Sequence, residues 1–182
     1  MKRESIAPRL DVKAFAESAS AISGLDLLSK YERLMLETHG MGADRSLAWS
    51  ARGEVRLDEA LAPQVWLHLT LAANLPLTCQ RCLGPVDIAV AVQRSFRFCD
   101  TEAMAAAQDE EAQEDVLALS QDFSLAELIE DEVLLALPLV ACHAACPVEV
   151  KLTVADPGFA AALTEKSNPF AVLAKLQGGK SN

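Results

Sequence analysis

The middle of the chain alternates between apolar and polar residues with a period of two. In residues 65–72 the odd positions are apolar, and in residues 88–98 the apolar residues stand at even positions. Such alternation is typical of half-buried β-strands. A Gly-Pro pair within residues 79–85 separates the two runs, which predicts an antiparallel hairpin with cysteines at its tip. Residues 46–57 predict a third strand.

Helical patterns flank this region on both sides. Residues 11–16 predict a short helix, and Ser23 is expected to cap a second one. The apolar positions of that second helix are Leu25, Leu28, Leu34 and Met35. After the strands, Ser124 and Glu127 have the spacing of a capping box, in which hydroxyl and carboxylate satisfy the first free amides of a helix. Proline cannot continue a helix, so this one is expected to end near Leu137, before Pro138.

Negative charge is concentrated in one block. The chain of 182 residues has 16 Lys and Arg against 26 Asp and Glu, a formal charge of −10, but residues 99–141 contain 12 acids and no Lys or Arg. Residues 100–115 mix these acids with Ala and Gln without an apolar stripe. We therefore expect a solvated, mobile acidic loop, bounded at 100–121.

Composition excludes several classes of protein. A chain this acidic differs from proteins whose main role is to grip bare phosphate backbones. No apolar run approaches the roughly 18 residues that a membrane helix needs, and no secretory signal is visible. These features predict a cytoplasmic protein without membrane contact. Phosphate-cradling glycine motifs, HExxH and nucleophile elbows are missing from the sequence, so neither an enzyme nor a small-molecule substrate is indicated.

The cysteines suggest a metal site. Cys79 and Cys82 are spaced like the ligands of a zinc knuckle, in which two thiolates at a turn reach one tetrahedral ion and a following glycine, here Gly84, allows a tight return of the chain. A second half-site, with Cys142 or His143 and with Cys146, stands 60 residues on. Only the fold could bring the halves together around a zinc ion. Plain burial of the thiols remains an alternative, and a redox pair is a weaker one because a strand rather than a helix follows.

Taken together, the patterns predict an α+β fold. Its antiparallel sheet has three or more strands with flanking helices, the acidic loop and a short C-terminal helix. We expect residues 1–44 to be a helical segment of the same domain, residues 45–146 to form the sheet-plus-helix core, and residues 147–182 to be an irregular tail. In the tail, Asn168 is the expected cap and Pro169 the first-turn residue of a helix whose apolar face contains Phe170, Leu173 and Leu176. So short a helix must dock on its own sheet or on a partner.

Four stretches in this order and spacing resemble the YceD family of large ribosomal RNA subunit accumulation proteins. They are LTCQRCL at residues 77–83, ELIEDEVLLALP at 127–138, His143 with Cys146, and NPFAVLAKL at 168–176. The resemblance covers about residues 45–176. It implies a non-enzymatic cytoplasmic factor needed for the synthesis, processing or stability of large-subunit (23S) ribosomal RNA, and it implies no catalytic residues.

Two modes of action fit this expectation. As a protein adapter, the chain would meet basic ribosomal proteins or assembly factors, because complementary charge selects partners. The candidate contact residues are Arg81, Glu130, Asp131, Glu132, Pro169, Phe170 and Leu173. Alternatively, it would bind ribosomal RNA directly through a local basic face containing Arg45, Arg52, Arg56, Arg81, Arg94 and Arg97. A third reading, a protein that handles thiols or zinc, rests on the cysteines alone.

Two charged residues interrupt apolar faces. Glu132 falls within the apolar stripe of the predicted helix, and Arg94 stands among the apolar positions of residues 88–98. A charge in an apolar face is costly unless it is paired. We therefore expect Glu132 to meet Arg94, or else Arg81, and the cation to lower the pKa of Glu132 against the opposing effect of desolvation.

Overall fold

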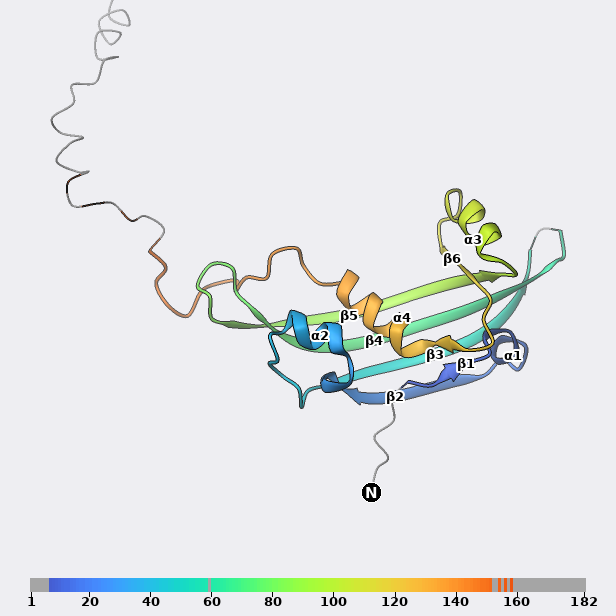
Figure 1. Ribbon diagram of the computed structural model, residues 1–182, viewed down its shortest axis with the longest axis horizontal. Coiled ribbons are helices and arrows are strands. Elements are labelled where there is room, and N and C mark those ends of the chain that lie inside the picture. Colours follow the sequence, from blue (N-terminus) through green and yellow to red (C-terminus); the bar gives the residue numbers. More distant parts are fainter. Residues whose placement is uncertain (1–6, 59, 152–153, 155, 157, 159–182) are drawn as a thin grey trace, which may run out of the picture. The chain divides into compact units, whose positions relative to one another are not determined.

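The computed structural model describes residues 7–58, 60–151, 154, 156 and 158. The chain divides into two units, Met1–Cys146 and Pro147–Asn182. The elements named below all lie in the first unit (Figure 1). The predicted C-terminal helix, with Pro169, Phe170 and Leu173, lies outside the described residues.

A five-stranded sheet forms the centre of the first unit, in the order β2-β3-β4-β5-β6. Its strands are β2 (Ala21–Leu27), β3 (Ser46–Leu57), β4 (Pro63–Thr78), β5 (Pro85–Cys99) and β6 (Asp115–Ala118). Neighbouring strands are antiparallel except β5 and β6, which are parallel. A separate small pair joins β1 (Arg9–Leu10) to β7 (Phe123–Ser124). The predicted α+β fold with an antiparallel sheet is confirmed.

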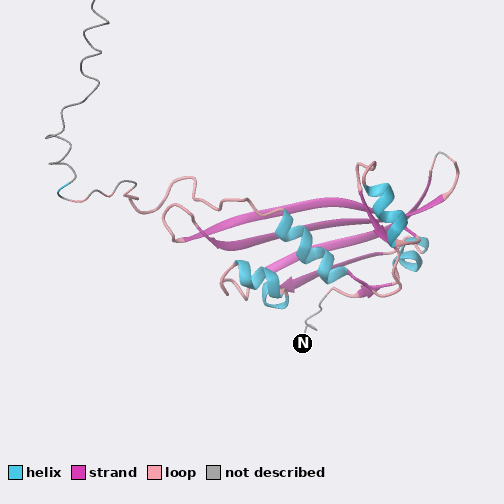
Figure 2. Cartoon of the chain, turned by 45° about the horizontal axis from the view of Figure 1, so that its top comes forward, coloured by secondary structure: helices cyan, strands magenta, loops and turns pink. Residues whose placement is uncertain are grey.

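Four α-helices accompany the sheet in the described part of the chain. They are α1 (Val12–Glu17), α2 (Glu32–Glu37), α3 (Glu102–Asp109) and α4 (Leu125–Leu135), and a 3₁₀ turn covers Leu28–Lys30. Helices α2 and α4 lie side by side over one face of the sheet (Figures 1 and 2). None of the described helices is long and apolar enough to cross a membrane.

The core lies between α4 and the alternating strands. Leu67, Leu69 and Leu71 of β4 are almost fully buried. Leu125, Ile129 and Val133 of α4 are fully buried as well, at 0% exposure. These α4 residues are spaced by four, so they share one face of the helix, and the β4 leucines are spaced by two, so they share one face of the strand. Burial of such matched faces is the main favourable contribution to folding.

Local capping explains where two helices begin. Asp11 accepts a hydrogen bond from the amide of Ala14 at 3.0 Å, and Ser124 accepts one from the amide of Glu127 at 3.3 Å. Both side chains satisfy amides that have no partner within the helix. The predicted helices at residues 11–16 and from Ser124 onward are confirmed, and α4 ends at Leu135, three residues before Pro138.

The prediction of a helix capped by Ser23 was wrong. Residues Ala21–Leu27 form strand β2, which pairs with β3 from Ala21 opposite Arg52 to Leu27 opposite Ser46. Leu25 is exposed, and the helix in this region is the short α2, which contains Leu34 and Met35. The leucine spacing imitated one helical face, but it spans two elements joined by a turn. Pairing along β3 outweighs local helix propensity.

The prediction of an acidic loop at residues 100–121 was wrong for residues 102–109 and 115–118, which form α3 and β6. Helix α3 begins after Thr101, which accepts a hydrogen bond from the amide of Met104, and β6 then joins the sheet beside β5. Arg97 holds this segment by donating to Glu114 and Gln108. Glu102, Asp109 and Asp115 therefore belong to regular elements, and the Arg97 side chain and a helix cap compensate for the weak apolar pattern of this segment.

Candidate metal centre

The tip of the β4–β5 hairpin carries the first half of a candidate metal centre. Thr78 pairs with Pro85, so Cys79 and Cys82 stand in the connecting turn. The amide of Cys79 donates to the carbonyl of Gly84, and the amide of Leu83 donates to the carbonyl of Cys79, both at 2.8 Å. Leu83 has a φ of 59°, so Leu83 rather than Gly84 adopts the left-handed conformation that turns the chain back.

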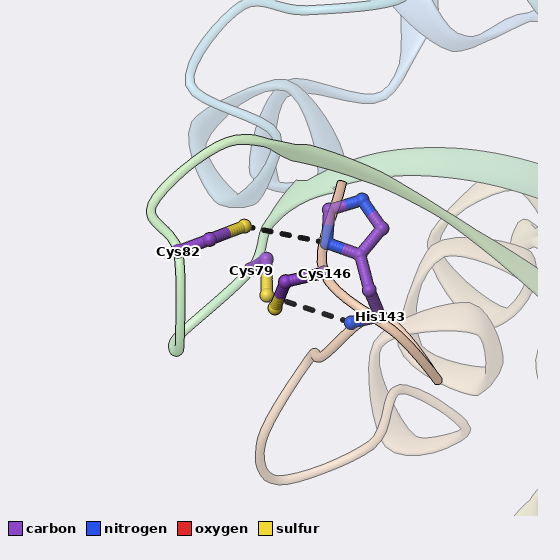
Figure 3. A group of neighbouring side chains, drawn as sticks. All are labelled: Cys79, Cys82, His143 and Cys146. Atoms are coloured by element: carbon purple, nitrogen blue, oxygen red, sulfur yellow. Dashed lines mark hydrogen bonds between the residues drawn. The ribbon is translucent and has the colours of Figure 1, made fainter. Parts of the chain in front are cut away.

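The second half comes from the segment that follows α4. The amide of Gln80 donates to the carbonyl of Ala141 at 2.8 Å, which ties this segment to the hairpin turn. Ala141 is buried, so the segment is fixed two residues before His143. Figure 3 shows His143 and Cys146 entering from this segment, opposite Cys79 and Cys82 from the hairpin.

Four potential ligand atoms converge here. The ligand atoms of Cys79, Cys82, His143 and Cys146 all lie within 4.8 Å of one another. The Nδ1 atom of His143 lies 3.4 Å from Sγ of Cys82, and the His143 amide donates to Sγ of Cys79 at the same distance (Figure 3). Three sulfurs and one imidazole nitrogen are a ligand set of structural zinc sites. This cluster can therefore hold a metal such as zinc.

The other two cysteines lie outside this group. Cys142 is half-buried and packs against the apolar core, and Cys99 stands at the far end of β5. Cys142 and His143 were alternatives for one ligand position, and it is the His143 side chain that lies with the sulfurs of Cys79, Cys82 and Cys146. The five cysteines are all free thiols.

Electrostatics within the cluster favour one thiolate before any ion binds. Burial raises the pKa of Cys79, but the backbone amides of Cys82, His143 and Arg81 outweigh it and bring that pKa down to about 5. Burial and the neighbouring Cys82 and Cys79 raise the pKa of Cys146 to about 11. A second thiolate is therefore unfavourable until a cation offsets the charge. Binding of a metal ion would supply that cation and release the remaining thiol protons.

A comparison with models of protein families decides the family. The model for the large ribosomal RNA subunit accumulation protein YceD matches residues 67–177, which is more than half of the chain. The chain belongs to the YceD family. No curated protein and no solved structure matches it significantly. YceD is not known as a family of enzymes.

The matched region of this YceD protein includes both halves of the cluster and the acidic run of α4. Glu130 is 8% exposed and Glu132 5% exposed, whereas Asp131 is exposed. Three consecutive acids on one helix thus face three environments. This follows from the helical rotation of about 100° between successive residues.

Glu130 caps another helix of this chain, α2. One of its oxygens accepts from the amides of Arg33 and Leu34 at 2.7 and 3.1 Å, and the other accepts from the Arg33 side chain at 3.0 Å. Arg33 also donates to Asp131 at 2.5 Å. The sequence analysis missed Arg33, because nearly 100 residues separate it from its partners and no local pattern connects them.

The predicted partnership of Glu132 is only marginal in the YceD structure. Its carboxylate lies 4.0 Å from Nε of Arg94, without a hydrogen bond, and Arg94 donates instead to Asp115. The expected lowering of the Glu132 pKa was wrong. Burial raises this pKa above its ordinary value, and the distant Arg94 offsets only part of that effect.

Arginines of the YceD protein are largely neutralised within the chain. Of the eight arginines that the structure describes, seven form salt bridges with carboxylates, namely Arg9, Arg33, Arg45, Arg52, Arg56, Arg94 and Arg97. The eighth, Arg81, stands in the hairpin turn between the two cysteines. Of the predicted basic residues, Arg52, Arg56 and Arg94 line one pocket of the sheet, where Arg52 and Arg56 share the carboxylate of Glu54 and Arg94 is held by Asp115. Arg45, Arg81 and Arg97 do not line this pocket.

Proposed function

We propose that this protein is a non-enzymatic cytoplasmic factor that supports the synthesis, processing or stability of large-subunit ribosomal RNA as a protein adapter. Membership of the YceD family supports the link to this RNA. The pairing of seven arginines with carboxylates carries the choice of an adapter. An arginine paired with a carboxylate adds little net positive charge to its surface, whereas binding of a phosphate backbone depends on net positive charge.

We also propose that the adapter contains a structural zinc ion held by Cys79, Cys82, His143 and Cys146. A closed set of four ligands leaves no position for a substrate, as is typical of structural zinc. The ion would clamp the segment after α4 onto the hairpin tip.

Direct RNA binding is the second candidate, and one observation supports it. Arg81 is the arginine of the described residues without a carboxylate within salt-bridge distance, and it is exposed at the hairpin tip. RNA contact by the isolated protein would therefore centre on this turn. An Arg81→Ala variant should abolish it, while an Arg45→Ala variant, which removes an arginine already paired with Asp87, should not.

The test of the adapter is made in cells that lack the chain. We expect the ratio of large- to small-subunit ribosomal RNA to fall, and the full chain to restore it. In sucrose gradients of these complemented cells, the reintroduced chain should sediment with precursors of the large subunit. Crosslinking should join the chain to proteins of these precursors. An unchanged ratio of large- to small-subunit ribosomal RNA in cells that lack the chain would contradict the proposed function. Crosslinking to RNA alone, lost in Arg81→Ala, would replace the adapter by an RNA-binding protein.

A further inference from the structure

A groove separates α4 from the edge of the sheet. Its volume is about 460 Å³, and its walls come from α4, β5, β6 and the end of α3. Its apolar lining residues include Phe96, Val116, Leu128 and Leu135. Phe96 and Val116 are buried beneath it, whereas Leu135 is 75% exposed at its rim. The groove thus has a fixed apolar floor and an accessible apolar edge.

Acidic side chains surround this apolar surface. Asp109, Asp115, Asp131 and Glu132 line the groove together with a single cation, Arg94. Arg94 is bound by Asp115, and a further cation, Arg33 of α2, pairs with Asp131. Counted together, the four carboxylates and two guanidinium groups leave a negative balance. Phosphate groups would be repelled here, and cationic side chains would be attracted.

Glu132 is the unusual member of this set. It is 5% exposed, accepts no hydrogen bond from a described residue, and lines the groove 4.0 Å from its closest cation. Its neighbour Glu130, equally buried, accepts three hydrogen bonds. A buried carboxylate without a close partner is costly, and a cation brought to it by another molecule would remove that cost.

We propose that this groove is the docking site of a cationic amphipathic segment of a protein partner. A lysine or arginine side chain of that segment would reach Glu132, and its apolar side chains would cover Leu128 and Leu135. Long cationic side chains suit this place because their methylene stems pack on apolar surface while the charged end reaches a carboxylate. The inference rests on the proposed adapter function and names the surface through which the adapter acts.

The partner class can be tested with a random library of 16-residue peptides displayed on phage and selected on the full chain. Peptides rich in Lys or Arg together with Leu, Ile or Phe should be enriched. The groove variant Asp131→Lys with Leu135→Ser should weaken their binding by more than about tenfold, because it removes attraction and apolar contact together. Both positions are exposed, so the fold should tolerate the changes.

The matched control is Glu17→Lys with Leu61→Ser. It makes the same changes of charge and polarity at exposed positions on α1 and in the β3–β4 connection. Its peptide affinity should equal that of the unmodified chain. No enrichment, enrichment of acidic or uncharged peptides, or equal binding by the groove variant would each overturn the proposal. A random RNA pool bound through the same residues would overturn it in favour of another partner class.

Failure of the inference can be separated from failure of the function. In cells that lack the chain, the groove variant should not restore the ribosomal RNA ratio, whereas the control variant should. If the groove variant restores it fully, the docking site is wrong but the adapter stands. If even the unmodified chain has no effect on the ratio, the proposed function itself is wrong.

Discussion

The hairpin tip and helix α4 both gather reactive side chains, but they arrange them in opposite ways. At the tip, residues from two distant segments converge until their ligand atoms lie within 4.8 Å of one another. On α4, the three adjacent acids diverge into two groups: Glu130 caps α2 and shares Arg33 with Asp131, whereas Glu132 lines the groove near Arg94. Convergent groups need one shared partner, whereas divergent groups are stabilised separately. Changes at the tip should therefore be cooperative, whereas a change at Glu132 should be independent of a change at Glu130.

The largest effect is expected from loss of the metal. Removing zinc with a chelator should lower the free energy of unfolding by about 4 kcal/mol, the stabilisation given by a ligand present at about a thousandfold over its dissociation constant. Cys79→Ser and Cys146→Ser should each produce most of this loss, and the double variant little more. Denaturant unfolding with and without chelator measures it. Cys99→Ser is the matched control, and additive losses at Cys79 and Cys146 would contradict a shared ion.

Removal of the Glu130 carboxylate should have the next largest effect. Glu130→Leu leaves the amides of Arg33 and Leu34 without their acceptor, and the Arg33 side chain loses one carboxylate. We expect a loss of about 3 kcal/mol in the free energy of unfolding. The exposed Glu127→Leu on the same helix serves as the control. A loss below that of the control would mean that α2 does not depend on this cap.

Glu132 should behave in the opposite way to Glu130. Because its pKa is raised in the folded state, this group favours folding below its ordinary pKa of 4.5 and loses that contribution as the pH rises through the raised value. Glu132→Gln should therefore increase the free energy of unfolding at pH 7 by about 1 kcal/mol. The gain should shrink as the pH falls toward 4.5. Melting curves across this range measure it, and destabilisation at pH 7 would show that the charge is well compensated.

The smallest effect should come from the pair of Glu132 and Arg94. Their separation of 4.0 Å without a hydrogen bond, together with the exposure of Arg94, predicts a coupling below about 0.5 kcal/mol in a double-mutant cycle of Glu132→Gln with Arg94→Met. The cycle of Arg94→Met with Asp115→Asn, whose side chains are hydrogen-bonded, should give the larger coupling. The reverse order would restore Glu132 as the main partner of Arg94.

Sequence patterns predicted this fold best where one local rule decides the structure. The alternation in β4 and β5 and the caps at Asp11 and Ser124 each depend on a few neighbouring residues. Strand β2 was missed because its structure depends on pairing with β3, which overrides the spacing of its leucines. Helix α3 and β6 were missed because a long-range cation, Arg97, fixes an acidic segment with weak apolar pattern.

In the candidate site, too, the sequence indicated only the residues that a local pattern marks. The spacing of Cys79 and Cys82 indicated two ligands at a turn, which is a local property. Sequence could not choose between Cys142 and His143, because the choice depends on how the segment after Ala141 is attached to the hairpin. Nor could it assign roles to the acids of α4, because their partners lie on α2, β5 and β6, far away along the chain.

Zinc X-ray absorption on the freshly purified full chain tests the central claim most directly. The account predicts one zinc ion per chain with three sulfur neighbours at about 2.3 Å and one nitrogen neighbour at about 2.0–2.1 Å. The Cys142→Ser variant should give the same spectrum, whereas His143→Ala should lose the nitrogen neighbour. A chain that purifies without zinc and takes up none, or a spectrum with mainly oxygen neighbours, would contradict the account.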